Sequence, residues 1–165
     1  MVEPAWREQP RPTVSPGATL LFRGEPRTPA DLTAHRLAVS AALHDAARPP
    51  QADEGAVERL LLAFEELVSN GLRHGTPPVT VEITQFDHFW LLDVGDQAAD
   101  RPPALAVGRD AALGGLGLHL VAQICGAYGW TVEGERKHVW GRIDYTRAEP
   151  PGHLPHPRPS GDAVG

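Results

Sequence analysis

Three polar side chains are spaced for chemistry on one segment of the chain. Glu66, Asn70 and His74 follow one another at intervals of four residues. On an α-helix this spacing places all three in one row along the helix axis. An Asn oxygen can bind a hydrated Mg²⁺ directly, and a Glu carboxylate can accept a proton from a nearby hydroxyl or water. The same spacing also occurs on ordinary solvated helix faces, so both interpretations stay open on this pattern alone.

A second candidate site is the glycine-rich segment 114–118, which reads Gly-Gly-Leu-Gly-Leu before an apolar run. Glycines at the start of a helix let backbone N–H groups close around an anion at the positive helix end. The segment is not a P-loop, because no Gly-Lys-Ser/Thr follows it. It is not a dinucleotide fingerprint either, because Leu120 occupies the position of the third glycine. The alternative is a tight loop that leads into a core helix.

Three predicted helices carry or flank these candidates. The polar row lies on a helix that Asp53 can cap, beside a separate stripe of apolar residues at helical spacing: Val57, Leu60, Leu61, Phe64, Leu67, Val68 and Leu72. An earlier helix is predicted over 29–47, because residues 28–31 read Thr-Pro-Ala-Asp. This sequence combines a capping hydroxyl, a proline at the first helical position and an acid three residues after the cap. A third helix is predicted over 117–126.

The remaining periodic segments predict strands. Residues 19–23 form a short apolar run, and 79–83 and 89–94 alternate like a hairpin that turns near Asp87 and His88. A final hairpin is predicted over 130–145, after a loop of about twenty residues. Helices that are segregated from a largely antiparallel sheet form a two-layer α+β sandwich, which is the fold class that we expect.

Length and composition indicate one globular domain with two tails. The chain has 165 residues, of which 41% are hydrophobic and 22% charged, so wholesale disorder is excluded. Of its 17 prolines, 11 lie in the first 29 or the last 19 residues. We therefore predict a disordered tail over 1–17, a domain over 18–146 and a Pro-rich disordered tail over 147–165.

Charge, hydropathy and cysteine content limit the partners and the cell compartment that we expect for this chain. A net charge of −6 argues against nucleic acid as a partner, since phosphate neutralisation needs a basic face. No apolar run approaches the roughly 18 residues of a membrane span, and no secretory leader is recognised, so we expect no membrane association. The single cysteine, Cys125, cannot form an internal disulfide. A cytoplasmic location is expected.

Taken together and in this order, the segments resemble a known family. Residues 61–75, LLAFEELVSNGLRHG, resemble the N-box of the GHKL ATPase superfamily, whose histidine-kinase-like ATPase domain has the Bergerat fold. Residues 114–121, GGLGLHLV, resemble its second glycine box, and 138–143, HVWGRI, its closing strand. The resemblance covers 19–146 and is closest to the anti-sigma factor serine/threonine kinase group.

The resemblance implies an ATP pocket between the helices and the sheet, closed by an ATP lid over 97–114 in which Arg101 and Arg109 are available to phosphate. It implies that Glu66 is the catalytic base, that Asn70 binds Mg²⁺ and nucleotide, and that His74 supports the site. Further cofactor-binding residues implied along the phosphate path are Gly115, Leu116, Gly117 and Leu118.

The family's first glycine box, D-x-G-x-G, supplies an aspartate that hydrogen-bonds the adenine amino group, and two registers are possible here. Asp93 keeps a glycine two residues later, whereas Asp96 is followed by Ala98 at that position. Residues 90, 92 and 94 are apolar and share one face of the predicted strand, and Asp96 continues that face toward the helices. We therefore expect Asp96 and Ala98 to contact the nucleotide.

By resemblance, the chain is expected to be a Mg-ATP-dependent serine/threonine kinase. Its substrate would be an anti-sigma antagonist with a STAS domain, its regulatory target a sigma factor, and its assembly a homodimer. Two alternatives differ in class. One is a histidine-kinase catalytic domain, for which Leu43-His44-Asp45 faintly resembles a phosphoacceptor segment. The other is a regulatory module that binds ATP without kinase activity.

Overall fold

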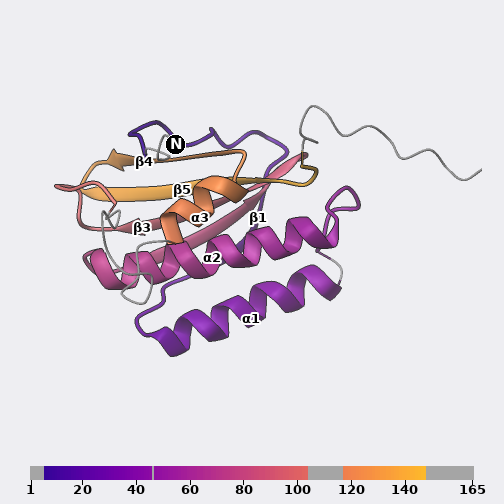
Figure 1. Cartoon of the computed structure of the whole chain (residues 1–165), viewed down its shortest axis with the longest axis horizontal. Helices are drawn as coiled ribbons and strands as arrows, with labels where there is room; N and C mark the ends of the chain where they lie inside the picture. The colour runs from indigo at the N-terminus through magenta and orange to yellow at the C-terminus, as the bar shows by residue number, and fades with distance from the viewer. Residues whose placement is uncertain (1–5, 46, 104–116, 148–165) are drawn as a thin grey trace, which may run out of the picture.

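Three helices lie along one face of a five-stranded antiparallel sheet in the computed structural model, which describes residues 6–45, 47–103 and 117–147 (Figure 1). The strands have the order β1-β2-β3-β5-β4. This arrangement confirms the predicted two-layer α+β sandwich.

The observed elements match the predicted segments to within a few residues. The helices are α1 (Pro29–Asp45), α2 (Glu54–His74) and α3 (Gly117–Ile124). The strands are β1 (Thr19–Gly24), β2 (Thr80–Gln85), β3 (Phe89–Asp96), β4 (Ala127–Glu133) and β5 (Arg136–Asp144). Local signals suffice for these bounds, because caps and alternation act within a few residues of the element that they start or shape.

Both long helices begin at the predicted caps. At the start of α1, the Thr28 hydroxyl accepts a hydrogen bond from the backbone N–H of Asp31 at 3.2 Å, and the Asp31 carboxylate accepts one from Thr28 N–H at 3.1 Å. At the start of α2, the Asp53 carboxylate accepts from Ala56 N–H at 2.8 Å. Each cap satisfies backbone donors that the first helical turn leaves unpaired.

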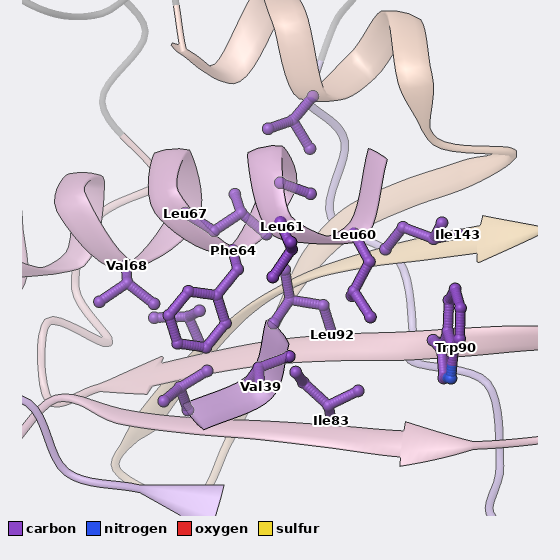
Figure 2. Close-up of a cluster of buried hydrophobic side chains, with 14 of the residues drawn as sticks. Val39, Leu60, Leu61, Phe64, Leu67, Val68, Ile83, Trp90, Leu92 and Ile143 are labelled. Carbon is purple, nitrogen blue, oxygen red and sulfur yellow. The ribbon is translucent and has the colours of Figure 1, made fainter. Parts of the chain in front are cut away.

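The core lies between the helices and the inward face of the sheet. Figure 2 shows Val39 of α1 and the apolar stripe of α2 directed at side chains of β2, β3 and β5, among them Ile83, Leu92 and Ile143. All predicted members of the α2 stripe are buried except Leu72, which is half-buried. One face of α2 is therefore fixed against the sheet, which fixes the position of its polar row as well.

Gly71 allows the end of α2 to approach the sheet closely. A Cβ built on Gly71 would lie 3.2 Å from methyl carbons of both Val79 and Val94. Contacts this short leave no room for a larger residue without movement of the neighbours. The glycine at position 71 thus lets α2 lie close to the end of β3, where Asp96 lies.

The N-terminal residues depart from the disordered tail predicted over 1–17. Trp6 is buried in the core with 7% of its surface exposed. Backbone hydrogen bonds of 2.8 and 3.1 Å join Gln9 and Arg7 to Trp130, so the segment pairs in parallel with β4. The prediction is wrong for residues 6–11, because one Trp brings enough apolar surface to order a segment that is otherwise polar and Pro-rich.

Other predictions fall partly outside the described residues. Of the lid predicted over 97–114, the structure describes only residues 97–103. Arg109, Gly115 and Leu116 lie outside the described residues, as does the predicted tail from residue 148 onward.

Candidate functional site

The predicted polar row is present on α2. Glu66, Asn70 and His74 lie on one uninterrupted helix, and each is half-buried beside the buried apolar stripe. At a rise of 1.5 Å per residue, the row is roughly 12 Å long from Glu66 to His74. A half-buried row of this length can line one wall of a ligand site while its helix remains anchored in the core.

One end of the row meets the start of α3. A Cβ built on Gly117 would overlap Glu66 Oε2 and would lie 3.3 Å from Glu66 Cβ. The absence of a side chain at Gly117 therefore lets the first turn of α3 rest against the Glu66 carboxylate. The structure thus brings the N-box segment and the last glycine of the second glycine box together.

The surroundings of the Glu66 carboxyl raise its pKa, which favours the protonated form. Its partial burial raises its pKa above the ordinary Glu value, the neighbouring charge of Glu65 raises it further, and Arg73 acts weakly in the opposite direction. A carboxylate with a raised pKa is a stronger proton acceptor than a free Glu. This is the direction that a catalytic base requires.

The other end of the row meets Asp96, which is only 2% exposed. Asp96 Oδ1 accepts hydrogen bonds from the backbone N–H groups of Ala98 at 2.6 Å and Thr76 at 3.3 Å. A Cβ built on Gly75, the residue after α2, would lie 2.8 Å from Asp96 Cγ. Asp96 is therefore held at the C-terminal end of α2, on the helix side of the sheet.

Asp93 lies on the opposite face, as strand parity predicts. Its carboxylate forms an ion pair with Arg11 and lies 3.1 Å from His138 Nδ1. Leu92 and Val94, its neighbours on β3, belong to the core between sheet and helices. The structure confirms the face of each aspartate, whereas the contact of Asp96 with adenine stays a prediction.

Lys137 is a residue near this site that the sequence analysis missed. Its Nζ lies 3.5 Å from Asp96 Oδ2, and the exposed fractions of the two side chains are 4% and 2%. The pairing of β3 with β5 places Asp96 opposite Lys137. The buried ammonium balances the charge of Asp96. Its position depends on a strand pairing between distant segments, and no local pattern signals that pairing.

The remaining predicted residues take different positions. Ala98 is buried and donates its backbone N–H to Asp96, and Leu118 is buried in the core with 1% of its surface exposed. The backbone carbonyl of His74 accepts a hydrogen bond of 3.4 Å from Arg101, so one of the two predicted lid arginines reaches the end of the row.

The oxygen donors of the row suit a cation that is only partly held by protein. Within the described ranges, no three His, Cys, Asp or Glu side chains converge as a ready-made metal site. Mg²⁺ commonly keeps several waters and takes one or two protein oxygens together with substrate phosphates. Asn70 fits that mode of binding.

The site and fold together define a class: an α+β sandwich with an N-box helix that is flanked by an inward aspartate and a glycine-led helix. The model of a family described as histidine kinase-like ATPase domain matches residues 28–143. The chain therefore belongs to the histidine kinase-like ATPase domain family, and the expected GHKL-type fold is confirmed.

A solved structure with low sequence identity is similar to this chain. Among solved structures, the Acinetobacter baumannii histidine kinase AdeS is similar with 17% identity and a TM-score of 0.39, over 55% of this chain and 48% of that one. The chain thus spans about half the length of that structure. No curated protein matches the chain. In the described part of the chain, no helix is long and apolar enough to cross a membrane.

Proposed function

We propose that this domain binds Mg-ATP and transfers the γ-phosphoryl group to a Ser or Thr of a partner protein, as anti-sigma factor serine/threonine kinases do. The observation that carries the proposal is the α2 row. It has a carboxyl with a raised pKa against Gly117 at one end and the buried Asp96 at the other.

The nucleotide would lie along this row. Asp96 accepts a hydrogen bond from the adenine amino group, for which a carboxylate already bonded to two backbone N–H groups has lone pairs left. Asn70 holds Mg²⁺, which neutralises phosphate charge when bound. Backbone N–H groups at the start of α3 face the phosphates at Gly117 and Leu118. Gly115 and Leu116 lie outside the described residues, and their contact with the phosphates stays a prediction.

Glu66 is the proposed base. The attacking hydroxyl oxygen forms a bond to the γ-phosphorus while the bond from that phosphorus to the β–γ bridging oxygen breaks, and ADP leaves. The hydroxyl proton goes to a Glu66 carboxylate oxygen. Positioning and charge neutralisation supply most of the rate in such transfers, and a positioned base adds to them.

The family resemblance supports the rest of the proposal. The phosphorylated partner would be a STAS-domain anti-sigma antagonist, the regulated protein a sigma factor, and the active form a homodimer in the cytoplasm. The family of this chain, described as histidine kinase-like ATPase domain, is compatible with that group and with histidine kinases alike. The class of phosphate acceptor is therefore the point that an experiment must decide.

The second candidate is a histidine-kinase catalytic domain, because the family model supports it equally. His44, its candidate acceptor, lies near the end of α1 with Nδ1 2.7 Å from Ser40 O and Nε2 3.3 Å from Glu54. These contacts, the Ser40 bond first, raise the pKa of His44. Both ring nitrogens of His44 thus already face an oxygen atom of the chain, which favours the Ser/Thr acceptor.

The test is incubation of the full chain with γ-labelled ATP and Mg²⁺ in an extract of the native host. Acid-stable label on Ser or Thr of a second protein is the expected result. Acid-labile label that disappears in His44→Gln would establish the histidine-kinase alternative. Nucleotide binding without transfer would leave a regulatory module, and absence of binding would overturn the whole proposal.

A further inference from the structure

The N-terminal strap, which we define as residues 6–11, joins the helix layer to the outer face of the sheet. At its first residue, the Trp6 indole Nε1–H donates a hydrogen bond of 3.1 Å to the backbone carbonyl of Leu118 in α3. The Trp6 ring also contacts Tyr128 of β4, with 4.9 Å between ring centroids. The buried end of the strap thus touches the first turn of α3.

The middle of the strap follows β4, beside which the N-terminal part of the chain runs in Figure 1. Arg7 and Gln9 exchange backbone hydrogen bonds with Trp130, and the Trp140 indole donates to Gln9 O at 3.1 Å. A Cβ on Gly129 would lie 3.0 Å from Arg7 O, so β4 has a glycine where the strap passes closest.

The far end of the strap is fixed by charge. Arg11 forms an ion pair with Asp93 of β3, and its second guanidinium nitrogen lies 2.6 Å from Glu133 Oε2 at the end of β4. Asp93 is on the face of the sheet away from the helices. The strap is therefore anchored on both faces, with the β4 edge between its two anchors.

We propose that the strap holds the first turn of α3 against the α2 row, and that Trp6 is a positioning residue for the nucleotide site. The inference rests on the proposed function, because that function makes the start of α3 part of the site. Leu118, which accepts the Trp6 bond, is the chain neighbour of Gly117, which rests against Glu66.

The length of α3 explains why such a support matters. With 8 residues, α3 is shorter than the roughly 12–15 residues below which isolated helices are only marginally stable in water. Its position must therefore come from tertiary contacts. Its buried side chains, Leu118 and Val121, hold it to the core. The Trp6 bond adds a directional contact at the end that faces the site.

The test compares the full wild-type chain with Trp6→Phe, which keeps an aromatic ring but removes the indole donor. Without nucleotide, amide exchange of residues 121–125 should become about three- to tenfold faster, as expected for loss of one neutral hydrogen bond. The NMR-measured pKa of Glu66 should fall toward the ordinary Glu value, since a looser α3 admits water. Affinity for a non-hydrolysable Mg-ATP analogue should fall at least twofold.

Trp90→Phe is the matched control. Trp90 is also buried and its Nε1–H donates a hydrogen bond of 3.2 Å to Gln85. It lies near the start of β3, six residues and roughly 20 Å from Asp96. This variant should lose comparable stability, with no change in α3 exchange relative to β5, in the Glu66 pKa or in nucleotide affinity.

Unchanged α3 exchange in Trp6→Phe, or equal changes in Trp90→Phe, would overturn the proposal. If Trp6→Phe does not fold, Arg11→Gln loosens the strap at its other end, where Arg11 pairs with Asp93, and should shift the same readouts in the same direction. Should the wild-type chain bind no nucleotide, the proposed function fails, while exchange and the Glu66 pKa still decide whether the strap holds α3.

Discussion

Glu66 and Asn70 have different proposed tasks, so their substitutions should separate binding from transfer. Asn70→Ala should weaken Mg-ATP binding and phosphotransfer together. Glu66→Ala should leave nucleotide affinity within a few fold, while the single-turnover transfer rate falls by about 10²–10⁴, the range for a positioned base. Titration with Mg-ATP and rapid-quench transfer measure the two quantities. A wild-type transfer rate in Glu66→Ala would refute the mechanism, even if ATP still binds.

The raised pKa of Glu66 also predicts how stability depends on pH. A carboxyl whose pKa is higher in the folded than in the unfolded state favours folding while protonated, and this contribution is lost as pH rises through the folded pKa. At pH 7 the ionised Glu66 therefore costs stability. Glu66→Gln should melt slightly higher than wild type at pH 7, and the difference should vanish near pH 3.5. Thermal melts at both pH values check this, and Glu58→Gln, at an exposed position of α2, is the control.

A test of the proposed contact between Asp96 and adenine must account for Lys137, because the two buried side chains form an ion pair. Asp96→Asn should weaken ATP binding by roughly ten- to hundredfold, as loss of a charge-assisted hydrogen bond predicts. It also leaves the buried ammonium of Lys137 without a counter-charge, a defect that costs about 3–5 kcal/mol. The double variant Asp96→Asn/Lys137→Met should recover melting temperature but not ATP affinity, as measured by calorimetry on both proteins.

Asp93→Asn is the control for that experiment. Asp93 binds Arg11 and His138 on the outer face, so its substitution should lower stability while ATP affinity stays within a few fold. A larger loss of affinity at Asp93 than at Asp96 would mean that the wrong aspartate has been assigned to adenine.

At the scale of the helices, Gly117 sets the distance between α3 and α2. Alanine usually stabilises a helix relative to glycine, yet a Cβ here would overlap the Glu66 carboxylate. The flexible Glu66 side chain can turn away, so Gly117→Ala should change the melting temperature by only a few degrees. The transfer rate should fall at least tenfold because the base is displaced.

The elements could be predicted because their signals are local. Thr28, Asp31 and Asp53 form the predicted caps, and the alternation along β3 assigned Asp93 and Asp96 to the correct faces. Contacts between segments that are far apart in the sequence could not be predicted, because local patterns do not report them. The pairing of Lys137 with Asp96 requires that β3 and β5 be neighbours in the sheet. The burial of Trp6 requires its contacts with Leu118 of α3 and Tyr128 of β4, which no local pattern describes.

At the scale of the molecule, the two ends of the chain should respond differently to truncation. Deletion of residues 2–11 removes the buried Trp6, and a large buried aromatic side chain contributes about 3–5 kcal/mol. The melting temperature should fall by on the order of 10 °C for a chain of this size. Differential scanning calorimetry on the truncated chain measures this, and an unchanged melting temperature would contradict the role of the strap.

Deletion of residues 148–165 is the companion experiment. These residues lie outside the described part of the chain, and their composition offers little apolar surface to bury. Both melting temperature and ATP affinity should therefore stay nearly unchanged. A fall of several degrees would show that the segment contributes to the folded domain.

The buried ion pair of Lys137 has a practical consequence for work with this protein. Lys137 is the only lysine in the chain, beside fourteen arginines, and its side chain is 4% exposed. Amine-reactive dyes and cross-linkers attack neutral, accessible amines. In the folded chain Lys137 should therefore resist these reagents, and labelling of Lys137 would report opening of the sheet beside Asp96.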